Sequence, residues 1–385
     1  MAQRSRLRRS FLGSVALILG LATTEIDGEI VASEMQQATG ADRSTSGSLY
    51  SRNLGIAFVT TGTEDCAYRL RIYMTRDTGR SWREITPGKF PCETFVHDHV
   101  FLNAHRGRLV SNDCTGGEAF LYRTDDGGRN WSRTPVNPAS CNAGATLLLD
   151  FVDRRHGWLG HLEPTSGGDG DLQWTGDAGR SWSKVHDLPS TWLTELSFRN
   201  RRRGYLGGTS RMHPNRLYSS TDRGRDWNRE RVKRPPGYGD ATLYYDAPTF
   251  TGGAGVLRVS LVKNRREDIA FHVTRDGGRT WRRRTLLRTQ ARVERRGFVS
   301  SLGSSVASDE VWWVIARDAP YVYITTNGGQ DWTRRRADEL PGPGSLTAIG
   351  PKTAWATVYD ESSERNVLYR TRDGGRTWTR LHPGS

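Results

Sequence analysis

Long apolar runs and helical patterns are both scarce in this chain of 385 residues. Only residues 11–22 form a continuous, predominantly apolar stretch, and that stretch is too short to cross a bilayer. Apolar residues are nowhere spaced by 3, 4 and 7 over the length that an amphipathic helix needs. These absences exclude a helical fold and a chain that spans a membrane after its N-terminal segment has been removed.

Lysine is also scarce, with five of the 56 basic residues, so arginine carries most of the net charge of +14. A basic chain raises the question of nucleic-acid binding. The arginines are spread over the whole sequence, however, and many follow a recurring tryptophan. Charged side chains there would keep exposed outer strands from pairing with other chains. We expect no specific nucleic-acid binding, and an acidic protein, polymer or membrane surface stays open as a partner.

A ten-residue phrase ending in tryptophan occurs seven times, for example as YRTRDGGRTW at 369–378. Its core is Ser/Thr-x-Asp/Asn-x-Gly-x-x-Trp, and successive tryptophans are 45 to 54 residues apart. Repeats of this length are typical of solenoids and propellers. The two most constant positions hold Asp77, Asp126, Asp177, Asp222, Asp276, Asn327 and Asp373, and Trp82, Trp131, Trp182, Trp227, Trp281, Trp332 and Trp378.

Each phrase follows short apolar or alternating runs bounded by Gly and Asn/Asp, such as GIAFVTT at 55–61 and VWWVIA at 311–316. These runs predict strands. One more strand precedes each run, another leads into the phrase, and a fourth begins at its tryptophan. The sequence therefore predicts an all-β fold, a seven-bladed β-propeller of four-stranded antiparallel blades over residues 46–381, with a tail at 382–385.

The phrase itself has the chemistry of a turn. Asp or Asn accepts hydrogen bonds from the backbone of its own turn, and Gly adopts the positive φ that the hairpin requires. Tryptophan is large enough to fill the seam between neighbouring blades. Asn327 replaces Asp in the sixth copy, and this tolerance favours a structural role over a catalytic one.

The core resembles the Asp-box, or bacterial neuraminidase repeat, of sialidases, xyloglucan-active cellobiohydrolases, sortilin-type receptors and photosystem II assembly and stability factors. The longer patterns FVDRRHGW at 151–158 and FRNRRRGY at 198–205 are most similar to the last group and its bacterial relatives. The resemblance covers about residues 46–381. It implies a propeller whose box hairpins lie away from the usual binding face, and it says little about the ligand because the fold serves many functions.

Residues 1–22 have the features of a signal peptide, with a basic start, an apolar stretch and small residues at its end. RRSFL at 8–12 resembles a twin-arginine signal, and an ordinary secretory signal explains the paired arginines equally well. Residues 23–45 are polar and predict a spacer. We expect an exported, monomeric protein in the periplasm or outside the cell.

Four cysteines are present, and no two have the C-x-x-C spacing of many metal sites. Cys66 and Cys92 lie 16 residues before and 10 after Trp82, and Cys114 and Cys141 lie 17 before and 10 after the next box tryptophan. This recurrence favours the disulfides Cys66–Cys92 and Cys114–Cys141, with Cys92–Cys114 as the competing pairing. We expect no metal and no cofactor.

Two histidines in CETFVHDHVFLN (92–103) form a candidate binding site. His97 and His99 are spaced by two along a predicted strand, which would place them on one face where they could share a ligand. No third ligand for a metal is evident, and hydrogen-bonded or solvent-lined histidines near the central channel explain the pattern more simply.

For function, we expect an exported, non-catalytic binding or assembly scaffold that recognises a protein or glycan of the cell envelope through loops on one face. The alternative is a secreted glycoside hydrolase of sialidase-like type, which would require carboxylates near the channel. The candidates for catalysis are Glu93, Asp98, Asp240, Tyr244 and Asp246.

Overall fold

The computed structural model describes residues 43–63, 65–88, 90–113, 118–136, 146–162, 170–189, 195–207, 216–251, 254–289, 291–293, 302–316, 321–342 and 344–385. All regular structure within these ranges is β-strand. The described residues contain no helix long and apolar enough to span a membrane. The expected signal peptide and most of the expected spacer lie outside the described residues, and β1 begins at Arg43, slightly before the expected start of the propeller.

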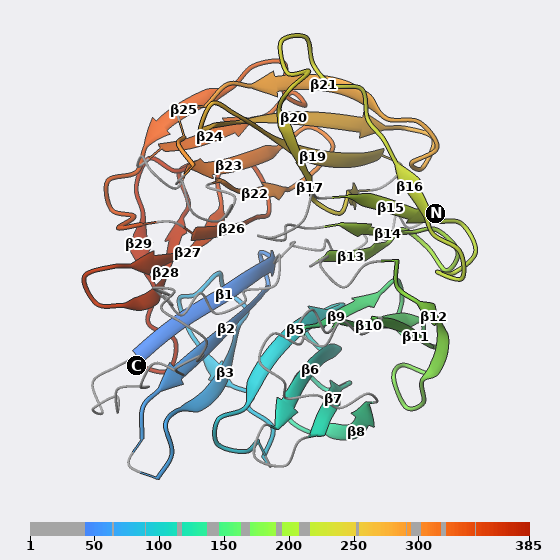
Figure 1. Ribbon diagram of the computed structural model, residues 1–385. Helices are drawn as coiled ribbons and strands as arrows, with labels where there is room; N and C mark the ends of the chain where they lie inside the picture. Colours follow the sequence, from blue (N-terminus) through green and yellow to red (C-terminus); the bar gives the residue numbers. More distant parts are fainter. Residues whose placement is uncertain are drawn as a thin grey trace, which may run out of the picture.

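The strands form seven antiparallel sheets, the blades, arranged in a ring (Figure 1). The strands of each blade are adjacent in sequence order, except that the first two strands of the fifth blade both pair with the third, and the first strand of a blade lies nearest the centre of the ring. Six blades have four strands and the fifth has five. The prediction of a seven-bladed β-propeller is confirmed.

The strand bounds follow the repeat. Blades 1 to 4 contain β1 (Arg43–Ser51), β2 (Leu54–Thr61), β3 (Arg69–Thr75) and β4 (Arg83–Glu84); β5 (Phe95–Phe101), β6 (Gly107–Asp113), β7 (Glu118–Thr124) and β8 (Ser132–Val136); β9 (Thr146–Phe151), β10 (Gly157–Leu162), β11 (Asp171–Thr175) and β12 (Ser183–Asp187); and β13 (Glu195–Phe198), β14 (Gly204–Gly207), β15 (Leu217–Ser220) and β16 (Asn228–Glu230). Blades 5 to 7 contain β17 (Thr242–Tyr245), β18 (Thr249–Thr251), β19 (Ala254–Lys263), β20 (Arg266–Thr274) and β21 (Arg282–Leu287); β22 (Leu302–Val306), β23 (Trp312–Ala316), β24 (Tyr321–Thr325) and β25 (Thr333–Arg336); and β26 (Gly344–Ala348), β27 (Ala354–Asp360), β28 (Arg365–Thr371) and β29 (Thr379–Arg380).

The first strand of blade 5 is interrupted. Both β17 and β18 pair with β19, and Asp246, Ala247 and Pro248 lie between them. Proline has no backbone N–H and cannot continue the ladder of hydrogen bonds. Tyr244, one of the catalytic candidates, lies in β17, the first segment of this interrupted strand.

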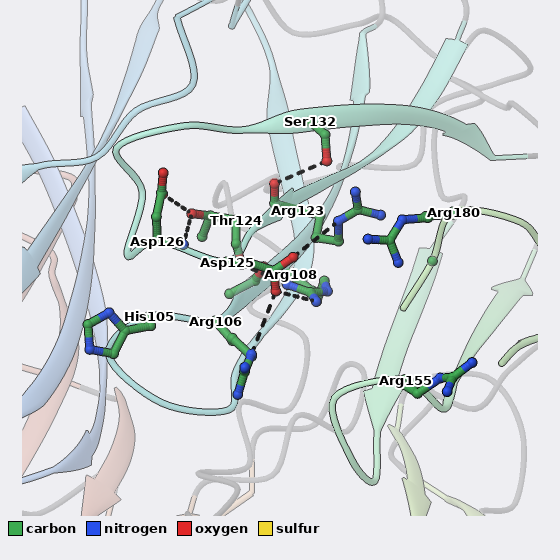
Figure 2. Close-up of polar contacts among 12 residues, drawn as sticks. His105, Arg106, Arg108, Arg123, Thr124, Asp125, Asp126, Ser132, Arg155 and Arg180 are labelled. Atoms are coloured by element: carbon green, nitrogen blue, oxygen red, sulfur yellow. Dashed lines mark hydrogen bonds and ion pairs between the residues drawn. The ribbon is translucent and has the colours of Figure 1, made fainter. Parts of the chain in front are cut away.

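The repeated phrase forms the turn between the last two strands of every blade, which we call the repeat turn. In blade 2, Asp126 Oδ1 accepts hydrogen bonds from the backbone N–H groups of Arg129 and Asn130 at 3.0 and 2.9 Å, and from the hydroxyl of Thr124 at 2.9 Å (Figure 2). The Thr124 hydroxyl in turn accepts the N–H of Gly128, which has a φ of 80°. These bonds, led by those from Asn130, lower the pKa of Asp126 to about 2.

The apolar core is divided among the seven seams between blades. The described residues form seven buried apolar clusters, one for each pair of neighbouring blades, and a repeat-turn tryptophan belongs to or packs against every cluster. Trp82 of blade 1, for example, packs against Trp355 of blade 7 with 5.5 Å between ring centroids. The expectation that these tryptophans fill the seams is confirmed.

The ring closes without exchange of strands between its ends. Blade 1 takes all of its strands from residues 43–84 and blade 7 takes all of its strands from residues 344–380. The seam between them is held by buried side chains around Trp355 and by hydrogen bonds between the two blades. Near the centre of the ring, these bonds run from the N–H of Gly47 to Thr357 Oγ1 at 3.1 Å and from the N–H of Leu49 to Thr347 Oγ1 at 3.0 Å.

A disulfide joins Cys66 to Cys92 across 26 residues, as predicted. It connects the loop after β2 to the loop before β5. Cys114 and Cys141, the second expected pair, lie outside the described residues. Asp65 and the two bonded sulfurs form the one group of potential metal ligands found within the described ranges, but sulfurs in a disulfide are not thiolates and do not suit a metal.

Candidate functional site

Polar side chains on the inner strands connect each blade to the next. At six of the seven seams, the described residues include a hydrogen bond between the innermost strands of two neighbouring blades. A side chain of one blade bonds to the first strand of the next blade or, in blade 5, to the break in that strand. The pairs are Ser48 with His99, Asp98 with Leu149, Asp150 with Phe198, Glu195 with Ala247, Ser305 with Ala348, and Thr347 with Leu49. Two of the sequence candidates, Asp98 and His99, belong to this set.

Asp98 uses both carboxylate oxygens on backbone groups. Oδ1 accepts the N–H of His99 at 2.7 Å, and Oδ2 accepts the N–H of Leu149 in blade 3 at 2.8 Å. A carboxylate held in this way fixes the position of a neighbouring strand. The structure thus gives Asp98 a role in joining blades 2 and 3.

His97 and His99 do not share one face of β5, so that expectation is wrong. The register of β5 against β6 shifts between Val96 and Asp98, which makes His97 the extra residue of a β-bulge. His99 contacts blade 1, with Nε2 3.2 Å from Ser48 Oγ and its ring 4.6 Å from that of Phe58. His97 instead lies on the side of blade 3. The two imidazoles therefore cannot act together on one ligand.

Burial keeps both imidazoles neutral near pH 7. It lowers the pKa of His99 to about 3. It also lowers the pKa of His97 to about 4, with a further contribution from His161 of blade 3. These environments fit side chains packed in the seams.

The break in the first strand of blade 5 holds a cluster of ionisable groups. Arg258 Nη1 lies 2.8 Å from Asp246 Oδ2, and Arg258 Nη2 lies 3.4 Å from Glu267 Oε1. The side chains of Arg258 and Glu267 are almost completely buried. One guanidinium is thus shared by two carboxylates, including Asp246, which the sequence named as a catalytic candidate.

Glu195 of blade 4 reaches into the same cluster. Its Oε2 accepts the N–H of Ala247 at 2.6 Å. Burial and the nearby carboxylate of Asp246 raise the pKa of Glu195 well above its ordinary value. Sequence analysis missed this residue, although an acidic residue opening the otherwise uncharged strand ELSF was a usable signal.

The surroundings of Tyr244 disfavour its ionised form. Burial and the nearby carboxylate of Glu267 raise its pKa above the ordinary value of 10.0. A tyrosine that attacks a substrate needs a lowered pKa, or a neighbouring base that accepts its proton.

The remaining carboxylate candidates lie elsewhere. Glu93 Oε1 accepts the N–H of Ala67 at 3.1 Å beside the disulfide. Asp240 is exposed and pairs with Lys263 at 2.8 Å. Of the five catalytic candidates, Asp246 contacts the buried Arg258, and Tyr244 lies near the carboxylate of Glu267, which pairs with the same arginine.

A groove of about 720 Å³ opens between blades 5 and 6 on the side of the repeat turns. Its lining combines the apolar side chains of Val256, Val273 and Trp312 with arginines of blade 5 and with Asp309 and Glu310 of blade 6. Such a groove has room for an apolar side chain between charged walls.

Comparison with known proteins supports the fold, and one family model matches the C-terminal part of the chain. The model of the family described as photosynthesis system II assembly factor YCF48 matches residues 265–382. No curated protein matches the chain.

Among solved structures, YCF48 from Cyanidioschyzon merolae is similar, with 16% identity, a TM-score of 0.51 and coverage of 78% of this chain and 88% of that one. A structure described as YCF48 bound to D1 peptide shares 18% identity over 74% of this chain and 97% of that one, with a TM-score of 0.36 that is too low to transfer its binding mode.

The GH74 xyloglucanase from Xanthomonas campestris has 14% identity and a TM-score of 0.58, with coverage of 90% of this chain and 55% of that enzyme. Identities this low establish the fold alone. The chain is accordingly a seven-bladed β-propeller that resembles the photosystem II assembly factors, and its residues 265–382 match the YCF48 family.

Proposed function

We propose that this protein is a non-catalytic scaffold that binds another protein. The observation that carries the proposal is the match of residues 265–382 to a family of assembly factors. Proteins of that kind act by holding a partner, and a rigid ring of blades presents loops from several repeats for this purpose.

The positions of the carboxylates support this proposal. Asp98 joins two blades, Glu93 holds a loop, and Asp246 forms an ion pair with Arg258. A glycoside hydrolase needs two carboxyl groups facing one substrate, one as acid and one as base or nucleophile. Each of these three carboxylates already has a structural partner.

One observation favours glycoside hydrolysis as a second candidate function. Glu195, whose pKa is raised, lies close enough to Asp246 for the two carboxyl groups to interact. A protonated carboxyl beside an ionised one is the arrangement of a general acid and its partner. The Arg258 ion pair on Asp246 and the bond from Glu195 to Ala247 argue against it.

A hydrolysis assay separates the two candidates. The purified chain would be incubated with sialosides, xyloglucan and other glycans while release of reducing sugar is followed, in parallel with the Glu195→Gln and Asp246→Asn variants. We expect no release from any of them. Release by the wild type that both variants abolish would replace the scaffold with an enzyme.

The binding function itself is tested by cross-linking. A photoreactive residue placed at exposed positions around the ring would be activated in the native cell compartment, and cross-linked proteins would be identified by mass spectrometry. We expect one recurrent protein partner from neighbouring positions. Cross-links that fail to converge on a partner would contradict the proposal.

We also propose that the protein is exported. Residues 1–22 have the features of a signal peptide, and the Cys66–Cys92 disulfide is a bond of oxidising compartments. Fractionation of the native host, with alkylation of free thiols before lysis, tests this. We expect the protein outside the cytoplasm with Cys66 and Cys92 protected from alkylation, and cytoplasmic protein with both thiols alkylated would refute export.

A further inference from the structure

The Cys66–Cys92 disulfide has polar surroundings and is partly open to solvent. It joins the loop after β2 to the loop before β5. Both loops lie on the side of the ring away from the repeat turns, because β2 begins and β5 ends on the repeat-turn side. Both cysteines are half-buried, and neither belongs to one of the seven apolar clusters formed by the described residues. A thiolate can therefore reach this disulfide more easily than one packed in an apolar core.

A cation lies against one of the two sulfurs. Arg69 Nη2 is 3.5 Å from Cys92 Sγ, and the same nitrogen is 2.6 Å from Asp65 Oδ2. Cys66 Sγ instead lies 3.1 Å from Thr63 Oγ1, which is uncharged. A neighbouring guanidinium stabilises a thiolate through a charge-assisted contact. The two sulfurs thus differ, and Cys92 is the one placed to carry a negative charge when the bond breaks.

The fold does not depend on this bond. The chain has four cysteines and all of them precede β9, so blades 3 to 7 form their sheets and repeat turns without a disulfide. Other contacts hold the two bridged loops together. Glu93 Oε1 accepts the N–H of Ala67 at 3.1 Å, and the hydroxyl of Tyr68 donates to the Glu93 carbonyl at 2.9 Å. The disulfide can therefore open and re-form while the propeller stays folded.

We propose that Cys66–Cys92 is a redox-active disulfide that accepts two electrons from a dithiol of another protein, with Cys92 as the leaving thiolate beside Arg69. This activity goes beyond the scaffold function above and does not depend on it.

The exchange proceeds in two steps. A thiolate of the dithiol attacks Cys66 Sγ and forms a mixed disulfide, while the bond to Cys92 breaks and its electron pair leaves on Cys92 Sγ. The second thiolate of the dithiol then attacks its own sulfur in the mixed disulfide and releases Cys66 as a thiolate. Both cysteine thiolates take up protons from water, so the chain gains two thiols and the dithiol becomes a disulfide. The first step is faster when the leaving thiolate is stabilised, which is the role of Arg69.

Reduction kinetics of the full oxidised chain test the proposal, with dithiothreitol as the dithiol. Samples would be quenched with acid and alkylated, and free Cys66 and Cys92 would be measured by peptide mass spectrometry so that the other cysteines do not contribute. We expect a rate proportional to the dithiothreitol concentration, with unchanged tryptophan fluorescence. A rate that levels off at high concentration would mean that the chain must unfold first, and would overturn the proposal.

Arg69→Gln is the decisive variant. It should slow reduction about ten-fold, because the leaving thiolate loses its charge-assisted contact. Arg69→Lys keeps a cation at this position and should recover most of the rate. Equal rates for the wild type and Arg69→Gln would contradict the assignment of Cys92 as a stabilised leaving group.

Arg71→Gln is the matched control. Arg71 follows two residues later on β3, is exposed, and lies 3.7 Å from Glu84, away from the disulfide partners described above. The substitution removes the same charge and should leave the rate unchanged. Equal slowing by Arg69→Gln and Arg71→Gln would show a general attraction of the reagent to a basic surface, and the proposed role of Arg69 would be wrong.

A monothiol identifies the sulfur that is attacked. Glutathione stops at the mixed disulfide, which acid quenching and alkylation would trap for peptide mapping. We expect glutathione on Cys66 and a free, alkylated Cys92. Glutathione mainly on Cys92 would reverse the direction of attack and overturn the proposal.

Discussion

Glu195 shows how a single residue in a repeat fold acquires a special environment. It lies in the first strand of blade 4 and bonds to blade 5. In other blades too, a polar side chain of the first strand bonds to the next blade. Unlike those side chains, Glu195 reaches a break in the neighbouring strand that contains another carboxylate, Asp246. Its altered pKa therefore arises from the interrupted strand of blade 5.

The raised pKa of Glu195 predicts a pH-dependent stability. Because the folded state holds this proton more tightly than the unfolded state, the stabilisation is complete below the ordinary value of 4.5 and is lost as pH rises through the raised value. Glu195→Gln keeps the acceptor for Ala247 and cannot ionise. We expect this variant to gain at least about 1 kcal/mol in unfolding free energy over the wild type between about pH 5 and pH 8.

Urea denaturation across this pH range measures the difference. Glu361→Gln, at an exposed glutamate, is the control and should follow the wild-type curve. Parallel curves for the wild type and Glu195→Gln would show that Glu195 ionises as readily in the folded chain as in the unfolded one.

At the scale of the element, the repeat turn determines how each blade ends. One oxygen of its Asp accepts two backbone N–H groups, and the preceding Ser or Thr hydroxyl accepts a third. Blade 6 makes a similar turn with Asn327, whose Oδ1 accepts the N–H of Asp331 at 3.0 Å. The turn requires an acceptor oxygen, and a full negative charge is dispensable.

We therefore expect Asp126→Ala and Asp126→Asn to differ. The alanine variant loses the carboxylate that accepts the N–H groups of Arg129 and Asn130 and should lower the unfolding free energy by about 1 to 2 kcal/mol, since the bonded groups are partly hydrated. The asparagine variant should lose less than half as much. Chemical denaturation of both variants tests this, and equal losses would mean that charge is essential to the turn.

At the scale of the whole molecule, closure of the ring depends on one seam. Six seams join blades that follow each other along the chain, whereas blades 1 and 7 come from its two ends. Trp355 is fully buried in that seam and packs against the glycines of blade 1, where a Cβ at Gly55 would lie 2.3 Å from its ring. No loop of the chain connects these two blades directly, so the seam between them depends on side-chain packing and hydrogen bonds.

Trp355→Ala should therefore loosen both ends of the chain. We expect a loss of about 3 to 5 kcal/mol in unfolding free energy, as for other buried tryptophans, with faster hydrogen exchange in β1, β2, β27 and β28. Trp158→Ala removes the equivalent buried residue from the seam between blades 3 and 4 and serves as control. It should cost similar stability without faster exchange in β1, and identical exchange patterns would contradict the role of the terminal seam.

Much of the fold was predictable because it repeats. Seven copies of Ser/Thr-x-Asp/Asn-x-Gly-x-x-Trp specified the number of blades, the turn chemistry and the tryptophans that fill the seams. Cys66 and Cys92 were paired correctly because their positions around Trp82 recur in the next repeat.

The candidate sites were less predictable, because they depend on departures from the repeat. The bulge at His97 moves this histidine to the other side of β5 from His99. The alternation of residues along a regular strand does not predict a bulge. Pro248, at the break in the strand, is present in the sequence. The contact between the break and Glu195 was not predictable, because it joins residues of two different blades.

By itself, the sequence determined the architecture, since a turn and a seam residue are local requirements that recur with each repeat. Only the tertiary structure decided which side chains meet between blades. Arg123 and Arg180 are about 60 residues apart along the chain, and they lie near each other because the ring places blades 2 and 3 side by side (Figure 2). Contacts of this kind depend on the angle and register between sheets, which no short stretch of sequence encodes.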